Sequence, residues 1–426
     1  MHLRIKKRRT KHITVDILLL LPFFELMVFE LLSKKGYMES EANFIMSICS
    51  ICRLIISIYY IFLRKSYWSY TAMGFAVFII SENIVSTLNG SIYINYFIGS
   101  FTTVGLCLLC SALIRKSYKN YIDACITLFG ALSIINAIQC YAMPGGFFGA
   151  YYKESAVYLL GSKNTCFFFY AVFLYFLLYD EALEKKRFRL STLFIMLFLI
   201  GATYVSDAMN AFVMLCMAFV YYCMIALGTK VYKIFNIKYL LSTVTIVAVF
   251  ILIPELRGIF KPILNMIGRD TTVTGRDVLW LQAITKFQKN PLIGNGILTE
   301  YVLETGVIAD HAHCHYLDVL AKYGVITFFS FVLTIVCVIR KAVLRKKHVK
   351  RMLALDCVFL GLFLLHSIID HLELFNFIVI LISIELLPVD CVPLAKLKPM
   401  YKMAFSDRTS TWQMVTVRTK EKDYFA

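Results

Sequence analysis

Residues 164–182 read N-T-C-F-F-F-Y-A-V-F-L-Y-F-L-L-Y-D-E-A, and the basic stretch K-K-R-F-R follows at 185–189. A run of this length, with charges only in its last turn, is long enough to cross a bilayer as a helix. A basic cluster directly after such a run is typical of the cytoplasmic end of a membrane span. The same alternation recurs along the chain and therefore decides the fold class.

Apolar runs of roughly 17–25 residues predict twelve membrane spans and an all-α polytopic membrane protein. The break between the seventh and eighth spans depends only on Ser206 and Asp207. A basic cytoplasmic N-terminus is expected at 1–12, a transmembrane domain at 13–390 and a cytoplasmic tail at 391–426. The expected spans are 13–32, 43–63, 68–88, 92–114, 121–142, 164–182, 190–206, 208–227, 239–256, 316–339, 352–369 and 372–390.

The distribution of basic residues tests this layout. With the N-terminus inside, 32 of the 44 Lys and Arg residues fall in cytoplasmic segments and 10 in external ones, while Arg53 and Lys322 fall inside spans. This bias follows the positive-inside rule and predicts that both termini are cytoplasmic. Six of the ten external basic residues lie in the segment 257–315. The positive-inside rule alone would place few basic residues in an external segment, so this segment is expected to carry function.

Composition excludes several other classes of protein. The 426 residues are 59% hydrophobic and 17% charged, which a soluble globular chain does not reach. The net charge of +17 is accounted for by basic residues at span ends, where they meet anionic headgroups, so nucleic-acid binding is not expected. Most of the 13 cysteines lie in apolar runs and are interpreted as small hydrophobic residues, including the pairs Cys49/Cys52 and Cys107/Cys110. The first span lacks a small-residue cleavage pattern, so we expect it to be retained.

The segment 257–315 contains a predicted amphipathic helix. Thr274-Gly275-Arg276-Asp277 resembles a helix start, with Thr274 as the cap. Apolar residues then recur at helical spacing, Asn290-Pro291 ends the helix, and Gly294-Asn295-Gly296 forms a turn. We expect this helix at the outer membrane surface. Arg276 in its first turn would offer an anion both a guanidinium and free backbone N–H groups, although a snorkelling surface arginine gives the same pattern.

A histidine-rich stretch, D-H-A-H-C-H-Y-L-D at 310–318, precedes the tenth span. Three interpretations apply. The stretch forms an interfacial polar cluster, or it binds zinc through His-x-His on an extended strand, or it supplies a general base suited to near-neutral pH. A helix would point the two imidazoles of His-x-His apart, and no third zinc ligand is evident. The general base is therefore favoured.

The stretches G-R-D-V-L-W (275–280), N-P-L-I-G-N-G (290–296) and H-A-H-C-H-Y-L-D-V-L-A-K-Y-G-V-I-T (311–327) resemble the O-antigen polymerase/O-antigen ligase family of bacterial membrane glycosyltransferases. In that family a histidine is followed by Asn, Ser or Gln, then nine residues, then Gly-x-x-Gly/Thr/Tyr. His313, Gly324 and Thr327 fit the spacing, whereas Cys314 departs from the usual residue. The detailed resemblance covers residues 275 to 327.

The resemblance implies an enzyme of the bacterial cytoplasmic membrane that transfers glycans carried on undecaprenyl pyrophosphate at its outer face. The first expectation is a repeat-unit polymerase for surface polysaccharide (O-antigen, capsule or exopolysaccharide). The lipid-linked glycan would be both donor and acceptor, and a chain-length regulator would be a possible partner. The family is inverting and metal-independent, so no cofactor and no metal are expected. Arg276 would neutralise the leaving pyrophosphate, and His313 would accept the proton of the attacking hydroxyl.

Further residues are expected to bind the substrate. Family members often carry an arginine, near a Ser-Arg pair on an earlier span, that helps to bind pyrophosphate. The matching place is Ser206-Asp207, without an arginine, so the second phosphate partner stays open. Its candidates are Arg257, Arg269 and the intramembrane Arg53, although Arg53 is more simply a partner for Glu25 or Glu82. The expected substrate-binding set is Arg269, Arg257, His311, His315, Tyr316 and Asp207.

Other functions remain as alternatives. A ligase that passes finished glycan to lipid A core or another acceptor would share these motifs. A transporter or flippase of lipid-linked sugars would have charged spans lining a midplane cavity, and a sensor or scaffold would not need this Arg/His pattern. Acidic residues do occur inside or beside spans, but they are scattered. They are Glu82, Asp123, Asp356, Asp370 and Glu385.

Overall fold

The computed structural model describes residues 12–24, 39–64, 68–90, 94–147, 156–184, 189–227, 235–252, 276–303, 306, 308–346, 349–388, 403–404 and 413–414. The chain divides into two units, Met1–Leu387 and Pro388–Ala426. The described residues of the second unit form two short antiparallel strands, β5 (Met403–Ala404) and β6 (Gln413–Met414). The first unit contains the apolar helices.

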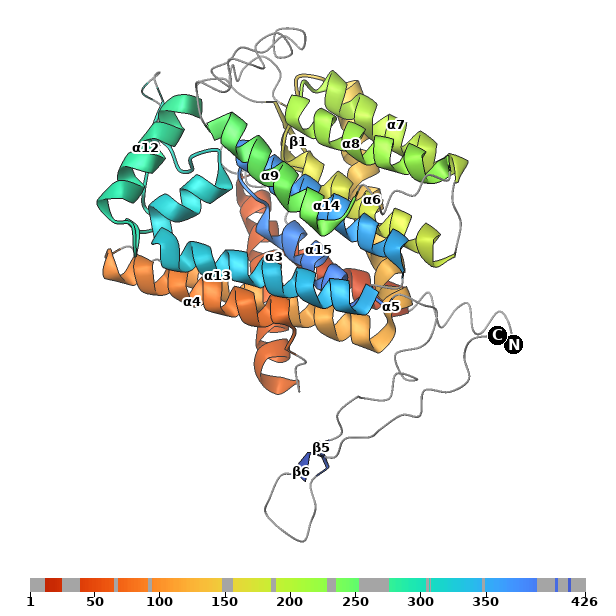
Figure 1. Ribbon diagram of the computed structural model, residues 1–426, viewed down its shortest axis with the longest axis horizontal. Helices are drawn as coiled ribbons and strands as arrows, with labels where there is room; N and C mark the ends of the chain where they lie inside the picture. Colours follow the sequence, from red (N-terminus) through yellow and green to blue (C-terminus); the bar gives the residue numbers. More distant parts are fainter. Residues whose placement is uncertain are drawn as a thin grey trace. The chain divides into compact units, whose positions relative to one another are not determined.

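The first unit is a bundle of helices (Figure 1), which confirms the predicted all-α membrane class. A helix lies in each of the twelve expected ranges. Within the described residues, seven helices are long and apolar enough to cross a membrane, and four shorter apolar helices accompany them. The number of crossings stays a prediction. The helices are His12–Phe23, which ends in the 3-10 turn η1 (Leu21–Phe23), α3 (Glu39–Ile58) with the π-helical turn η2 (Tyr59–Leu63), α4 (Tyr70–Leu88), α5 (Ile94–Ala142), α6 (Cys166–Leu183), α7 (Leu190–Val205), α8 (Met209–Ala226), α9 (Ile237–Leu252), α12 (Arg276–Lys289), α13 (His315–Lys346), α14 (Lys350–Ile369) and α15 (Leu374–Leu386).

Two long helices are interrupted. Helix α5 contains the fourth and fifth expected spans and breaks at Ser117, whose backbone is extended. The Ser117 hydroxyl accepts a hydrogen bond from the Asn120 N–H at 3.3 Å, which caps the second half of the helix. Helix α13 breaks at Gly324. The expected break between the seventh and eighth spans is present as a turn after Val205, where Asp207 has a positive φ of 54°.

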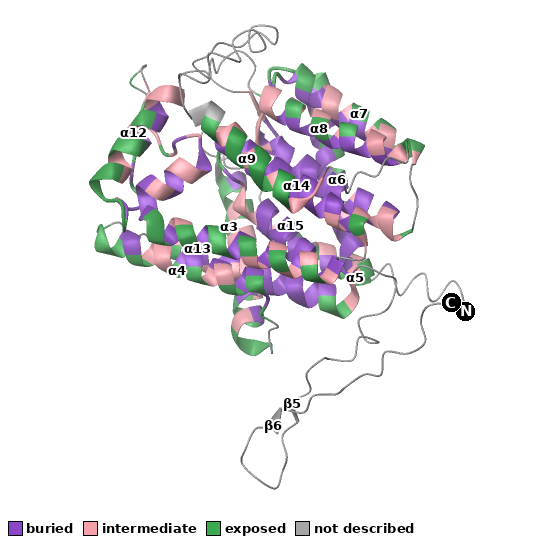
Figure 2. Ribbon diagram, in the orientation of Figure 1, coloured by how far each residue is buried: buried purple, intermediate pink, exposed green. Residues whose placement is uncertain are grey.

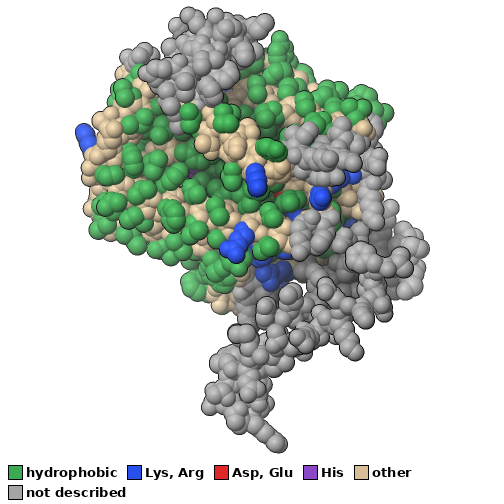
Figure 3. Space-filling view, in the orientation of Figure 1, with side chains coloured by type: hydrophobic (Ala, Val, Ile, Leu, Met, Phe, Trp, Pro, Cys, Tyr) green, Lys and Arg blue, Asp and Glu red, His purple; other side chains and the backbone are tan. Residues whose placement is uncertain are grey.

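Helices α6, α14 and α15 form the centre of the bundle (Figure 2). Helix α14 contacts α6, α8, α9, α13 and α15. In the most apolar stretch of α14, 89% of the residues are buried, whereas only 11% are buried in the corresponding stretch of α3 and η2. A helix that is apolar all round packs at the centre, whereas α3 leaves most of its apolar surface for lipid. The face in Figure 3 is mostly hydrophobic, with few basic side chains.

Buried ion pairs tie the helices together at the end of the bundle that is predicted to be cytoplasmic. The Lys346 ammonium lies 2.5 Å from the Asp356 carboxylate, which also accepts a hydrogen bond from the Tyr175 hydroxyl at 2.9 Å. The Glu385 carboxylate accepts backbone N–H groups at the start of α4 and pairs with Lys341 at 2.7 Å. Because each buried charge has partners, these contacts fix the order of α4, α6, α13, α14 and α15.

Candidate functional site

The break in α13 is filled by the loop that follows α12. Gly324 has a φ of +74°, and the helix resumes beyond it. The break deprives the carbonyls of Ala321 and Lys322 of their helical partners. They accept hydrogen bonds instead from the backbone N–H groups of Asn295 (3.1 Å) and Gly296 (2.8 Å). The expected Gly-Asn-Gly turn therefore serves as an external cap for the first, short part of α13.

Glycine is required on both sides of this junction. A Cβ atom on Gly324 would lie 2.3 Å from the carbonyl oxygen of Leu292, and one on Gly294 would lie 2.4 Å from that of Lys322. Both glycines also have positive φ. The two backbones touch, so the loop and the helix break form one rigid corner.

Helix α12 rests on a small apolar core next to this corner. It begins at Arg276, and its buried face packs on the start of α13 and on the antiparallel strands β3 (Tyr301–Val302) and β4 (Ile308–Ala309). The predicted end of the helix before Asn290-Pro291 is confirmed, the expected cap Thr274 lies outside the described residues, and the position of the helix at the membrane surface stays a prediction. The core consists of Leu279, Ala283, Tyr301, Ala312 and Ala321.

An ion pair at the start of α13 organises the histidine turn. The Asp318 carboxylate accepts the N–H of Ala312 at 3.2 Å and lies 3.0 Å from the Lys322 ammonium. Lys322 in turn donates to the carbonyl oxygen of Asp310 at 2.5 Å. The turn holds His313 at a φ of +50°, which is unusual for a residue with a side chain. Strain of this kind persists only where the surroundings enforce it, and it is common at functional sites.

Arg276 and His313 both lie against Asp370, which follows α14. The guanidinium is 3.8 Å from one carboxylate oxygen of Asp370, and His313 Nδ1 is 3.5 Å from the other. Arg276 also donates to the carbonyl oxygen of Ile369, so its charge lies at the C-terminal end of the α14 dipole. Burial raises the pKa of Asp370, but the bond to His313 and the charge of Arg276 outweigh it and leave the pKa below its ordinary value.

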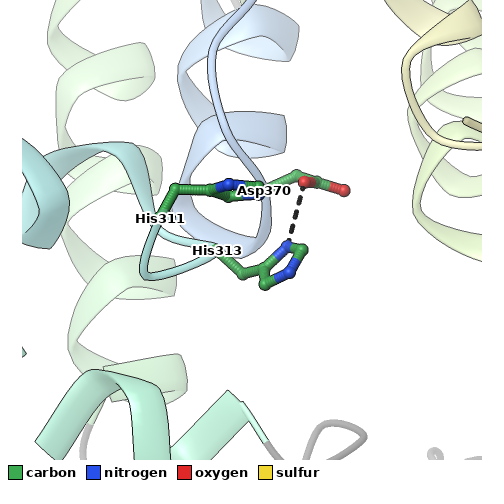
Figure 4. A group of neighbouring side chains, drawn as sticks. All are labelled: His311, His313 and Asp370. Carbon is green, nitrogen blue, oxygen red and sulfur yellow. Dashed lines mark hydrogen bonds and ion pairs between the residues drawn. The ribbon is translucent and has the colours of Figure 1, made fainter. Parts of the chain in front are cut away.

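His311 lies beside His313, with ring centroids 4.3 Å apart. Its Nδ1 is 2.5 Å from the carboxylate of Asp310. Burial is the largest single influence and disfavours the charged imidazole, but the hydrogen bond to Asp310 and the charges of Asp310, Asp318 and Asp370 together outweigh it and raise the pKa of His311. The same bond lowers the pKa of Asp310. Two Asp–His pairs, Asp310–His311 and Asp370–His313, therefore lie side by side, and Figure 4 shows three of their four members.

The spacing of this cluster also meets the basic requirement of a metal site. Ligand atoms of His311, His313 and Asp370 lie within 4.8 Å of one another. However, the Arg276 guanidinium contacts the same carboxylate and would repel a divalent cation placed there. The carboxylate already serves the guanidinium and an imidazole, so we assign no metal to the cluster.

The structure places the other expected site residues elsewhere. His315 is buried against Phe331, and the Tyr316 hydroxyl donates to the carbonyl oxygen of Leu364 at 2.8 Å. Asp207 is exposed in the turn before α8 and pairs with Lys163 at 2.9 Å. Their substrate-binding roles stay predictions. Arg257 and Arg269 lie outside the described residues.

Sequence reasoning missed the central role of Asp370. It appeared only among scattered acidic residues beside the spans. The signal was local, because Asp370-His371 follows the eleventh expected span at the end predicted to be external. Glu82, considered as a partner of Arg53, accepts a hydrogen bond from the Tyr96 hydroxyl at 3.1 Å. Glu25, the other candidate partner, lies outside the described residues, so the partner of Arg53 stays a prediction.

The fold and the site together define a class, namely a multi-pass membrane protein with an arginine, a histidine and a carboxylate gathered at one end of its bundle. Residues 155–332 match the model of the O-antigen ligase family. This match supports the resemblance to the O-antigen polymerase/ligase family, whose membrane is the bacterial inner membrane and whose substrates are lipid-linked glycans. No curated protein matches the chain.

Proposed function

We propose that this protein is a polysaccharide repeat-unit polymerase that works at the outer face of the cytoplasmic membrane. The observation that carries the proposal is the shared contact of Arg276 and His313 with Asp370. A permanent cation and a base contact the same carboxylate, and glycan transfer from a lipid pyrophosphate requires both kinds of group in one site. The family match supports the reaction class.

The reaction joins a hydroxyl oxygen of one lipid-linked repeat to the anomeric carbon of a glycan on a second lipid carrier. The bond from that carbon to the pyrophosphate breaks, and undecaprenyl pyrophosphate leaves. The acceptor hydroxyl loses its proton to His313. Attack from the face opposite the leaving group inverts the anomeric centre, as the family resemblance implies.

Arg276 suits the leaving-group side. Its guanidinium keeps its charge at all relevant pH values and matches the geometry of phosphate oxygens. It is the first residue of α12, so an anion beside it also meets backbone N–H groups at the helix N-terminus. Charge that develops on the departing pyrophosphate is stabilised in place, which is the largest contribution available to this site.

His313 suits the acceptor side, and Asp370 positions it. The carboxylate of Asp370 faces Nδ1, which directs Nε2 away from α14. A neutral imidazole in this tautomer accepts a proton at Nε2 and becomes a cation that Asp370 stabilises. Asp370 also holds Arg276, so one carboxylate sets the distance between the base and the pyrophosphate-binding group.

Helix direction is consistent with the proposed side of the membrane. The site lies where α13 begins and α14 ends, and the basic cluster 340–351 lies at their other ends. A helix of 20 residues is about 30 Å long, which is the thickness of the hydrocarbon core. If the basic cluster is cytoplasmic, as the positive-inside rule predicts, the site faces outward.

A ligase is the second candidate, because the matching family model is described as O-antigen ligase. Deleting the gene separates the two. Loss of a polymerase leaves one-repeat glycans, whereas loss of a ligase leaves long glycans on the lipid carrier. Complementation with His313→Ala or Arg276→Ala then tests the site. Normal glycan ladders at normal protein levels would refute the assignment.

A further inference from the structure

We infer that His311, paired with Asp310, holds a proton beside His313 and thereby keeps His313 available as the base at lower pH. This inference rests on the proposed function, in which His313 accepts the acceptor proton. His311 is a positioning residue in this account, since it acts through the neighbouring imidazole rather than on the substrate. Its role is to determine which member of the pair of imidazoles is charged.

The geometry of the two rings supplies the first argument. Their centroids are 4.3 Å apart, and both side chains are about one-third exposed. Two positive charges at this distance repel one another, and the water that reaches these partly exposed rings reduces the repulsion without removing it. Adding a second proton to the pair is therefore opposed.

The two carboxylates decide which ring carries the first proton. Asp310 contacts His311 at 2.5 Å. Asp370 lies farther from His313, at 3.5 Å, and its charge is shared with the Arg276 guanidinium and the backbone N–H of His371. The Asp310 carboxylate is 92% exposed, so water weakens its charge, but its contact is 1 Å shorter than that of Asp370 and is not divided with a guanidinium, which favours the proton on His311. The raised pKa of His311 agrees with this order.

Other charged groups face the pair from the surrounding elements. Asp318 and Lys322 lie near His311 on α13. They form an ion pair, so the negative charge of Asp318, which favours a proton on His311, is opposed by the positive charge of Lys322. The His371 ring lies 5.5 Å from that of His311, in the link between α14 and α15. Glu373 approaches from the start of α15. None of these groups touches His311 as closely as Asp310 does.

The test compares two substitutions that keep or remove the charge. His311→Gln removes it and leaves the Asp310 carboxylate beside His313, so His313 takes up a proton more readily. His311→Lys keeps a cation on Asp310. The measurement is the pH dependence of kcat/KM between pH 5 and 9, with purified protein in lipid nanodiscs. The probe is the lipid-linked repeat unit extracted from cells that lack the protein.

We expect His311→Gln to shift the acid limb of the profile upward by about 0.5 to 1 pH unit. His311→Lys should keep the parental limb. Glu300→Gln is the matched control, because it removes the charge of an exposed carboxylate in the same external segment. A thermal melt confirms that each variant is folded.

Three results would overturn the inference. One is a parental acid limb in His311→Gln, and another is the same shift in both His311 variants, which would show that charge is irrelevant. The third is loss of activity in both variants at every pH, which would make His311 part of the chemistry itself. Full activity of His313→Ala would instead refute the proposed function and is measured in the same series.

Discussion

At the scale of single residues, Asp370 carries the most weight, because it contacts both proposed catalytic side chains. Replacing it with Asn keeps the shape but removes the negative charge that contacts Arg276 and the carboxylate that orients His313. We expect kcat to fall by about 10²–10³-fold with a smaller change in KM, as for other lost orienting groups. Steady-state rates measured with the lipid-linked repeat check this.

The matched control for Asp370→Asn is Asp180→Asn. Asp180 pairs with Arg189, which also contacts Glu184, and partly exposed pairs contribute little to stability. Activity close to the parent is expected for this control. Equal kcat values for Asp370→Asn and the parent would remove Asp370 from the account.

At the scale of elements, the corner between α13 and the loop after α12 depends on Gly324. We expect Gly324→Ala to destabilise the protein by several kcal/mol, because a Cβ would lie 2.3 Å from the Leu292 carbonyl oxygen and the residue has a positive φ. Gly306→Ala is the control, since Gly306 shares the positive φ but has open space around it. It should cost only about 1 kcal/mol.

Thermal unfolding followed by size-exclusion chromatography distinguishes these two variants. A larger loss in Gly324→Ala than in Gly306→Ala, together with lost activity, supports the rigid corner. Similar losses in the two variants would mean that the loop moves away easily and does not position the site.

The buried pair Lys346–Asp356 joins α13 to α14. Lys346→Ala would leave the Asp356 carboxylate buried and unpaired, and we expect a loss of about 3–5 kcal/mol in the free energy of unfolding. Lys163→Ala breaks an exposed pair and should lose less than about 1 kcal/mol. The same thermal assay tests both, and a loss in Lys346→Ala no larger than in Lys163→Ala would contradict the importance of the buried pair.

Local patterns predicted the elements well where one segment determines its own structure. The end of α12 followed from Asn290 and Pro291, and the α7–α8 break followed from Ser206 and Asp207. The break of α13 was missed, because residues 316–339 are mostly apolar and Gly324 is only one glycine among them. Its cause is the distant Gly294 loop, and such contacts between segments are not encoded in local periodicity.

The site was predicted in part for the same reason. Arg276 and His313 were identified, and the structure brings them together on one carboxylate. Asp370 belongs to a different span, so only the packing of α14 against α13 reveals it. His315 and Tyr316 lie close to His313 in sequence, but the start of α13 turns them into helix interfaces.

At the scale of the whole molecule, the topology can be tested by cysteine labelling. Glu300→Cys, predicted to be external, should react with a membrane-impermeant maleimide in intact spheroplasts. Lys238→Cys, predicted to be cytoplasmic, should react only after permeabilisation. The parent protein corrects for its native cysteines. The reverse labelling pattern would turn the site toward the cytoplasm and contradict the proposed function.

The most direct test of the central claim is a reconstituted reaction with purified protein in nanodiscs and one-repeat lipid-linked glycan as the only substrate. The account predicts that the parent protein forms polymer, releases undecaprenyl pyrophosphate and needs no added metal. His313→Ala should slow both products together by at least about 10²-fold. Polymer formation by His313→Ala at the parental rate would contradict the claim that glycan transfer occurs at the site formed by Arg276, His313 and Asp370.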